Sequence, residues 1–212
     1  MIKAVIFDLD GTLLNTLEDL KESTNFALAY FGYPTRSLEE VRNFVGNGVR
    51  KLIERAVPKD CSNTEECLEI FKKNYSENMY NHTKPYNGIL EILKNLHQEN
   101  LKIGVVSNKF DAAVKDLCQK YFGDLVDIAI GQNDDVPKKP APNGVLKAMK
   151  ILGSDKTSTL YAGDSDVDVQ TAKNANLPCI GVTWGFRDRE NLEGANFIID
   201  CPDEILEIVR SL

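Results

Sequence analysis

Short apolar runs alternate with amphipathic segments along most of the 212-residue chain, and this pattern predicts an α/β protein. The first run, Val5–Phe7, suits a strand buried on both faces, although so short a run also fits a buried helix. From residue 84 onward, similar runs predict strands at Leu101–Val106, Ile128–Ile130, Thr159–Ala162, Cys179–Thr183 and Phe197–Ile199. Helical periodicity predicts helices at Ile89–Glu99, Asp111–Tyr121, Asn143–Leu152 and Val167–Asn174, and from Pro202 to the C-terminus. Together these elements predict a doubly wound, Rossmann-like parallel sheet with helices on both faces.

The segment between the first run and residue 84 has a different pattern. Its amphipathic stretches predict helices at Leu17–Phe31, from Ser37 onward, at Val49–Val57 and at about Glu65–Tyr80. Thr16 can cap the first helix, and Ser37-Leu38-Glu39-Glu40 is a capping-box sequence. No strand pattern occurs there, so we expect an all-helical cap domain (residues 15–82) inserted into a core domain (residues 1–14 and 83–212).

Composition and charge narrow the classes of partner. With 42% hydrophobic residues the chain can bury a sizeable core, and its net charge of −7 argues against nucleic acid or an anionic membrane as main partner. No apolar run is long enough to span a membrane, and the first run meets two aspartates at once, unlike a secretory signal. We therefore expect a cytoplasmic protein, and whether it is a monomer or a homodimer stays open.

Two carboxylates stand where the first predicted strand ends. Asp8 and Asp10 are two positions apart, so both side chains point to the same side of a strand. At a separation of about 5 Å and an effective dielectric constant near 20, two such charges repel by roughly 3 kcal/mol. A divalent cation would offset this repulsion, and Gly11 permits a sharp turn with backbone N–H groups near an anion. The same residues also suit an ordinary turn.

Polar residues also follow other predicted strands. Ser107, Asn108 and Lys109 follow the run LKIGVV, and Gly163–Asp168 follows the run TLYA, while Lys139 precedes a predicted helix. Taken singly, these residues also suit a strand end, a helix cap or a solvated lysine pair. In an open parallel sheet, however, the carboxyl ends of the strands meet at one edge, where ligands bind. The sequence therefore predicts a single site there.

These motifs, in this order, resemble those of the haloacid dehalogenase superfamily, which consists largely of phosphatases. The matching residues are DLDGT at Asp8–Thr12, Ser107, Lys139 in KPAP and GDSDVD at Gly163–Asp168. The resemblance spans nearly the whole chain, with the helical insertion placed like that family's first type of cap. In addition, FVGNG at Phe44–Gly48 and GVTWGF at Gly181–Phe186 are similar to the phosphoglycolate phosphatase branch.

The resemblance implies a phosphomonoesterase mechanism. Asp8 would be the nucleophile that forms an aspartyl-phosphate, and Asp10 would serve as general acid and then general base. Ser107 would hydrogen-bond a phosphoryl oxygen, and Lys139 would offset charge in the transition state. The dehalogenase branch lacks an acid at the place of Asp10, so Asp10 favours phosphoryl transfer.

The resemblance also implies a metal and substrate contacts. Mg²⁺ would be held by Asp8, Asp164 and the backbone carbonyl of Asp10, with Asp168 supporting the site. Five scattered cysteines and two histidines favour no nitrogen or sulfur metal site. The expected contacts to a small phosphorylated metabolite are Gly11, Thr12, Asn108, Gly46, Asn47 and Arg50.

The cap contacts come from one glycine-rich segment. In Phe44–Gly48, two glycines flank Asn47 and permit a close approach to a small anion, with Arg42, Arg50 and Lys51 nearby. An ordinary helix–helix turn with solvated basic residues is the alternative. Arg187 is a further candidate for the rim of the site, and we expect hinges near Asn15-Thr16 and Asn81–Pro85.

Several functions remain open on sequence alone. The leading hypothesis is a Mg²⁺-dependent phosphomonoesterase acting on 2-phosphoglycolate. Inorganic pyrophosphatase and phosphosugar phosphatase or mutase share the architecture. A phospho-accepting signalling module and a non-catalytic binding protein of the same fold are the alternatives from other classes.

Overall fold

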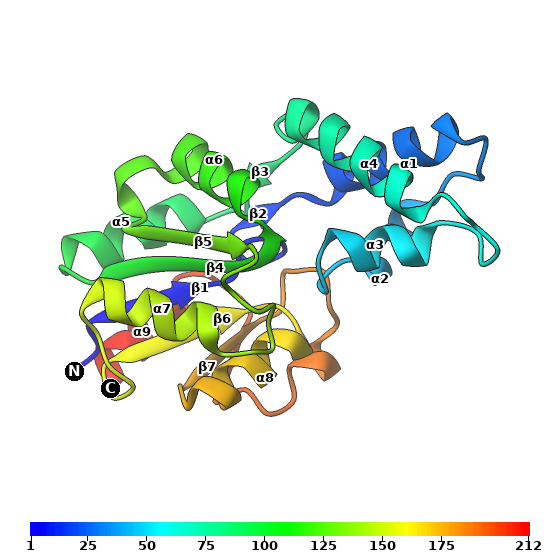
Figure 1. The fold of residues 1–212 in the computed structure, drawn as a ribbon. Helices are drawn as coiled ribbons and strands as arrows, with labels where there is room; N and C mark the ends of the chain where they lie inside the picture. Colours follow the sequence, from blue (N-terminus) through cyan, green and yellow to red (C-terminus); the bar gives the residue numbers. More distant parts are fainter.

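A computed structural model describes residues 1–212, and its centre is a six-stranded parallel sheet (Figure 1). The strands are β1 (Ala4–Phe7), β4 (Lys102–Phe110), β5 (Ile128–Gln132), β6 (Thr159–Gly163), β7 (Cys179–Val182) and β8 (Phe197–Ile199). Their order is β5-β4-β1-β6-β7-β8, and β1 pairs in parallel with both β4 and β6. Because the chain continues to β4 on one side of β1 and to β6 on the other, β1 lies at the topological switch point, where sheets of this kind bind ligands.

Five helices cover the two faces of the sheet. They are α5 (Ile89–Gln98), α6 (Asp111–Phe122), α7 (Asn143–Leu152), α8 (Asp166–Ala175) and α9 (Glu204–Ser211). Successive side chains of a strand point to opposite faces. Accordingly, Val5 and Phe7 belong to the buried cluster that includes residues of α5, α6 and α9, whereas Ile6 packs with residues of α7 and α8. The predicted doubly wound α/β fold is confirmed.

Four further helices lie beyond the carboxyl ends of the strands (Figure 1). They are α1 (Leu17–Tyr30), α2 (Leu38–Phe44), α3 (Val49–Ala56) and α4 (Thr64–Asn78), and we refer to them as the cap. The cap joins the core through two short strands, β2 (Leu14–Asn15) and β3 (Lys84–Pro85), which pair antiparallel. The division of the chain into domains at these points stays a prediction.

The local predictions differ from the structure in three places. The strands β2 and β3 were not predicted, because two residues are too few to show a hydrophobic pattern. The strand β4 continues past Val106 to Phe110, with a shift in its pairing to β5. The expected side-chain cap at Thr16 is wrong, since its hydroxyl donates to Asp10 instead, whereas the capping box of Ser37 and Glu40 is present.

Two 3₁₀ helices, Gly123–Leu125 and Arg189–Leu192, complete the secondary structure. None of the helices combines the length and the apolar character needed to cross a bilayer.

Candidate active site

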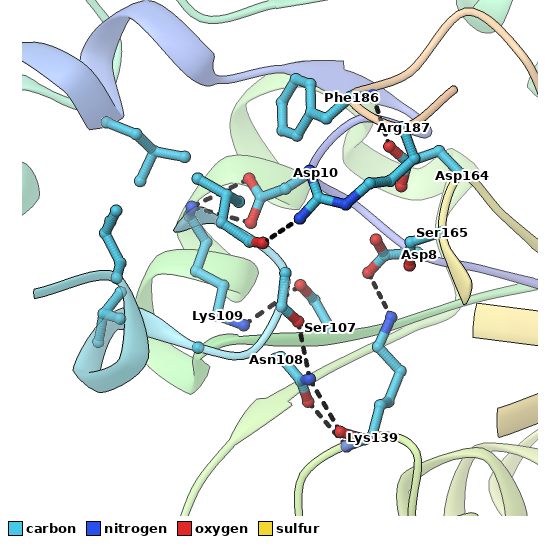
Figure 2. Close-up of a pocket in the computed structure, with 16 residues that line it drawn as sticks. Asp8, Asp10, Ser107, Asn108, Lys109, Lys139, Asp164, Ser165, Phe186 and Arg187 are labelled. Atoms are coloured by element: carbon cyan, nitrogen blue, oxygen red, sulfur yellow. Dashed lines mark hydrogen bonds and ion pairs between the residues drawn. The ribbon is translucent and has the colours of Figure 1, made fainter. Parts of the chain in front are cut away.

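A pocket lies between the carboxyl ends of β1, β4 and β6 and the cap (Figure 2). The core lines it with Asp8, Asp10, Ser107, Asn108, Lys109, Lys139, Asp164 and Ser165, and the loop after β7 adds Phe186 and Arg187. The cap contributes Leu20, Val45, Gly46, Gly48, Val49 and Leu52. The predicted convergence of polar strand ends is therefore present, and the cap covers it.

Lys139 connects the carboxylates at the base of the pocket. Its ammonium donates to Oδ1 of Asp8 and to Oδ1 of Asp168, at 2.7 Å each, and to the Tyr161 hydroxyl at 3.1 Å. Burial alone would lower the pKa of Lys139, but the charges of Asp168 and Asp8 outweigh it and raise that pKa. Lys139 is therefore a fixed positive charge beside the nucleophile candidate.

The ionised form of Asp8 is less favoured than that of an exposed aspartate. Burial raises the pKa of its carboxyl from 3.8 to about 7, opposed by Lys139 and reinforced by the negative charge of Asp168. Oδ1 is held by Lys139, whereas Oδ2 accepts no hydrogen bond from the protein. One oxygen is thus oriented and the other is free for a ligand.

Asp164 offers a second free oxygen. Its Oδ2 accepts the backbone N–H of Phe186 at 2.7 Å, and Oδ1 accepts no hydrogen bond from the protein. Burial, and then the charges of Asp168 and Asp8, raise the pKa of Asp164 well above its usual value. A β-carbon on Gly11 or Gly185 would collide with the Asp164 side chain, so both glycines permit this close packing.

These carboxylates are suited to a metal ion. Oxygen atoms of Asp8, Asp164 and Asp168 lie within 4.8 Å of one another. Asp168 is fully buried, and its two oxygens already accept hydrogen bonds from Lys139, Tyr161 and Ser165. The free oxygens of Asp8 and Asp164 are therefore the side-chain ligands available to a cation, while Asp168 orients Lys139.

Asp10 is held by two donors. The Thr16 hydroxyl donates to its Oδ1 at 2.7 Å, and the Lys109 ammonium donates to both Oδ1 and Oδ2 at 3.0 Å. Lys109 is buried, and its ammonium lies 4.6 Å from the centre of the Tyr75 ring in the cap. The sequence placed Lys109 at a strand end but assigned it no role. The only sequence feature that pointed to a role for Lys109 was its position directly after Ser107 and Asn108.

The predicted phosphoryl contacts divide into two groups. Ser107 lines the pocket, where its oxygen accepts the N–H of Lys109 at 3.3 Å. Gly11 and Thr12 do not line it. The N–H of Gly11 donates to the carbonyl of Leu14 at 2.9 Å, and the buried Thr12 hydroxyl has no hydrogen-bond partner. The Gly11 N–H, which was expected to contact an anion, is thus occupied by a hydrogen bond inside the turn.

Asn108 lines the pocket, but its side-chain amide is occupied. It donates to the carbonyls of Gly46 and Lys139, at 3.1 Å each, and accepts the Lys139 N–H at 2.8 Å. Asn108 therefore joins the cap to the loop that carries Lys139. Its side chain positions other residues instead of offering free groups to a substrate.

Two predicted cap contacts lie outside the pocket. Arg50 forms an ion pair with Glu65 on the surface of the cap, and the Asn47 side chain accepts a hydrogen bond from Arg55 at 2.8 Å. Both side chains are held by partners within the cap, so the expectation that they contact substrate does not fit this arrangement. Gly46 does line the pocket.

Arginine side chains form hydrogen bonds between the cap and the core, one from each side. Arg187 of the core donates to the carbonyls of Arg42, at 2.7 Å, and Val45, at 2.5 Å. In return, Arg42 donates to the Phe186 carbonyl at 2.5 Å and to Asp188 at 3.0 Å. Together with the bond from Asn108 to Gly46, these contacts hold the cap over the pocket. Arg187, a rim candidate, lies in the pocket wall.

The acidic, lysine-containing pocket lies under a helical cap at the carboxyl ends of a doubly wound parallel sheet, which is where enzymes with such sheets bind their ligands. The family model described as haloacid dehalogenase-like hydrolase matches residues 5–182, and the chain belongs to this family. The curated phosphoglycolate phosphatase of Aquifex aeolicus (strain VF5) is 31% identical over 209 residues, which cover 98% of this chain and 97% of that protein. That of Vibrio parahaemolyticus is 33% identical and covers 98% of this chain and 96% of its own length.

Solved structures agree with this assignment. A structure from Lactobacillus delbrueckii subsp. bulgaricus has a TM-score of 0.92 at 33% identity, covering 98% of both chains. That of a predicted phosphoglycolate phosphatase from Haemophilus somnus 129pt has a TM-score of 0.88 at 29% identity and covers 98% of this chain and 97% of its own. The prediction of a phosphatase of this family is confirmed.

Proposed function

We propose that this protein hydrolyses 2-phosphoglycolate, with Asp8 as nucleophile. The observation that carries the chemistry is the geometry of Asp8, whose Oδ1 is fixed by Lys139 at 2.7 Å while Oδ2 is free. Asp10, two residues further along, lines the same pocket. The names of the Aquifex aeolicus and Vibrio parahaemolyticus relatives support the choice of substrate.

The reaction proceeds in two displacements at phosphorus. One carboxylate oxygen of Asp8 forms a bond to phosphorus, the ester P–O bond breaks, and the leaving oxygen takes a proton from Asp10. Water then attacks phosphorus and gives a proton to Asp10, and the bond from phosphorus to Asp8 breaks to release phosphate. Lys139 and Ser107 stabilise the charge on the phosphoryl oxygens during both steps.

Mg²⁺ fits the free oxygens of the site. Asp8 and Asp164 would hold it, with the Asp10 backbone carbonyl as a further ligand, because hard cations prefer oxygen donors. Bound there, Mg²⁺ would reduce the repulsion between the anionic nucleophile and the phosphate. The raised pKa of Asp8, to about 7, reflects the same unfavourable burial of negative charge that a cation would offset.

A substrate panel with one substitution tests this proposal. Phosphate release would be measured from 2-phosphoglycolate, pyrophosphate, sugar phosphates and p-nitrophenyl phosphate, with Mg²⁺ and with chelator. We expect the highest kcat/KM on 2-phosphoglycolate, loss of turnover with chelator, and a rate reduced at least about 1,000-fold in D8N. D124N, which changes an exposed aspartate outside the pocket, is the matched control and should keep full activity.

The panel also separates the alternatives. Turnover concentrated on pyrophosphate or spread over sugar phosphates would retain the mechanism and reject the substrate. Conversion of a sugar phosphate to its isomer without phosphate release would indicate a mutase. Appreciable activity in D8N would remove Asp8 as the nucleophile.

A further inference from the structure

Lys109 is a buried cation on the cap side of the pocket. Its side chain is 2% exposed, and its ammonium lies 3.0 Å from each oxygen of Asp10. An ammonium has three N–H donors, so the contacts with Asp10 leave at least one for another acceptor. In Figure 2, the Asp10 carboxylate lies between this ammonium and Asp8. Lys109 therefore faces the part of the pocket beyond the general-acid candidate.

The other pocket cations are engaged elsewhere. Lys139 donates to Asp8 and Asp168 at the base of the site. Arg187 donates to two carbonyls of the cap. Of these three cations, only Lys109 contacts Asp10, the residue expected to protonate the leaving oxygen. A negative group on the leaving alcohol would therefore lie closer to the Lys109 ammonium than to the other two cations.

We infer that Lys109 is a specificity-determining residue that binds the carboxylate of the leaving group. The inference rests on the proposed function. In 2-phosphoglycolate the carboxylate is one methylene away from the ester oxygen, so an ester oxygen at Asp10 brings the carboxylate beside the ammonium. Lys109 then donates to Asp10 and to the substrate together, and places the ester oxygen at its proton donor.

The surroundings strengthen this contact. Leu20, Val49 and Leu52 of the cap line the same pocket, and the Tyr75 ring lies against the ammonium. A charge-assisted hydrogen bond is stronger where apolar groups exclude water. A substrate with a methyl group in place of the carboxylate would offer the ammonium neither a charge nor an acceptor. The pocket therefore favours esters whose alcohol carries an anion close to phosphorus.

A matched pair of substrates tests the inference. Ethyl phosphate is 2-phosphoglycolate with a methyl group in place of the carboxylate, so the ratio of the two kcat/KM values measures carboxylate recognition alone. In K109M we expect this ratio to fall about 100-fold, because the substrate carboxylate loses its buried cation. Any effect of the substitution on Asp10 slows both substrates and cancels in this ratio. K138M removes a lysine that lies near Gly48 but outside the pocket, and should keep the ratio of the wild type.

A second variant separates recognition from the positioning of Asp10. K109Q keeps N–H donors for Asp10 and loses the charge, so the ratio of the two kcat/KM values should fall as in K109M, while any effect on Asp10 slows both substrates and cancels in the ratio. If K109M does not fold, the two substrates can be compared in K109Q instead. An unchanged ratio in K109Q, with both substrates slowed alike, would show that Lys109 only positions Asp10 and would overturn the inference. A wild-type protein without preference for 2-phosphoglycolate would overturn the proposed substrate, and this inference with it.

Discussion

The burial of Asp8 and Asp164 makes the stability of the folded protein depend on pH. The pKa of Asp8 is raised by burial to about 7, from an ordinary value of 3.8, and that of Asp164 is raised as well. The folded protein therefore holds protons that the unfolded chain has released between about pH 4 and pH 7. Without metal, the contribution of Asp8 to stability is greatest below about pH 4 and is lost as the pH rises through about 7, and that of Asp164 is also lost as the pH rises.

Added Mg²⁺ should reverse this loss. A cation binds the deprotonated carboxylates, so its stabilising effect grows as they lose their protons. We expect saturating Mg²⁺ to raise the melting temperature more at about pH 8 than at about pH 5. Thermal unfolding with Mg²⁺ and with chelator at both pH values measures the difference. An equal increase at both would mean that these carboxylates do not hold the ion.

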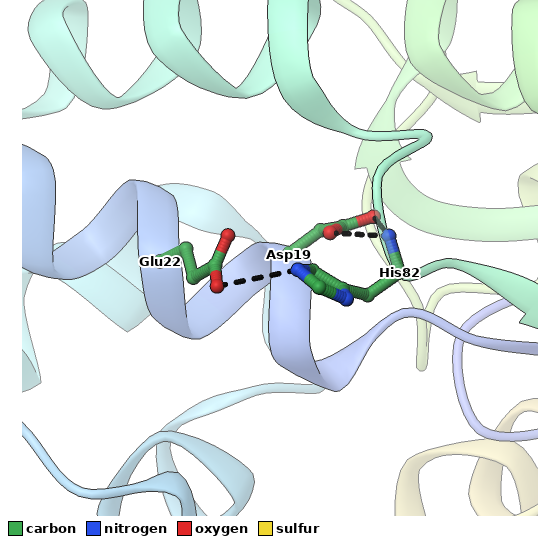
Figure 3. A group of neighbouring side chains, drawn as sticks. All are labelled: Asp19, Glu22 and His82. Carbon is green, nitrogen blue, oxygen red and sulfur yellow. Dashed lines mark hydrogen bonds and ion pairs between the residues drawn. The ribbon is translucent and has the colours of Figure 1, made fainter.

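Asp19 joins the cap to the strand that returns to the core (Figure 3). Its side-chain oxygens accept the backbone N–H of His82 at 2.9 Å and that of Thr83 at 2.9 Å. The His82 ring lies 3.3 Å from Glu22, and both side chains are about half exposed. The three residues lie within metal-ligand distance, but the Asp19 oxygens already have backbone donors. We interpret the group as a structural connection.

Removing the Asp19 carboxylate should destabilise the fold. D19A leaves two N–H groups near the start of β3 without acceptors, which costs about 2 kcal/mol in the free energy of unfolding. E22A, on the same helix, removes only the exposed pair and should cost less than about 0.5 kcal/mol. Urea unfolding of both variants provides the comparison. Similar losses in the two variants would contradict the interpretation.

At the scale of elements, reciprocal arginine contacts hold the cap closed. Arg42 at the end of α2 donates to the Phe186 carbonyl and to Asp188, but lies outside the pocket wall. We expect R42A to raise KM about fivefold with a smaller change in kcat, because the closed arrangement loses two bonds while the reacting groups stay intact. Steady-state kinetics on the preferred substrate measure this.

Arg55 provides the control for this prediction. It donates to the Phe44 carbonyl and to Asn47, both inside the cap, so R55A removes an arginine without touching the core. R55A should leave KM within about twofold of the wild-type value. An equal rise in KM in both variants would show that the integrity of the cap matters, and not its contact with the core.

The elements and the central site residues could be predicted because their signals are local. The apolar run before Asp8 predicts a buried strand, and the periodicity of the longer segments predicts the helices. The position of Arg50 could not be predicted in this way. Arg50 adjoins the glycine-rich segment in sequence but its side chain pairs with Glu65, whereas Arg187, a candidate for the rim of the site, lines the pocket. Such choices depend on three-dimensional partners.

Lys109 illustrates the same limit. A lysine after a strand is most often solvated, and nothing in its sequence neighbourhood indicates that it is buried. The structure buries it because β4 continues through Lys109 and the cap packs Tyr75 against its ammonium. That contact joins two residues 34 positions apart in the chain (75 and 109), one in the cap and one in the core.

At the scale of the whole molecule, hydrogen bonds and packing hold the cap over the pocket. The cap residues Val45 and Gly46 cover the pocket, and the Asn108 amide donates to the Gly46 carbonyl at 3.1 Å. The paired strands β2 and β3 connect the cap to the core. The same strands are short, so they leave the cap dependent on its packing against the core.

That packing predicts how the molecule unfolds. Buried apolar residues of the cap and of the core form one continuous cluster, and the Tyr75 ring of α4 meets Phe110 of β4 edge to face at 6.2 Å. We therefore expect cap and core to unfold together, because neither can separate without exposing apolar surface of the other.

The single tryptophan allows this expectation to be tested. Trp184 donates to the Thr12 carbonyl at 3.0 Å and reports on the core, whereas far-UV circular dichroism reports on all the helices, those of the cap included. Coincident urea midpoints for the two signals are expected in the wild type, and F110A should lower both together by weakening the shared cluster. A circular dichroism transition that precedes the tryptophan transition would show that the cap unfolds on its own. Residues 15–82 would then be an independent folding unit held closed mainly by polar contacts such as those of Arg42 and Arg187.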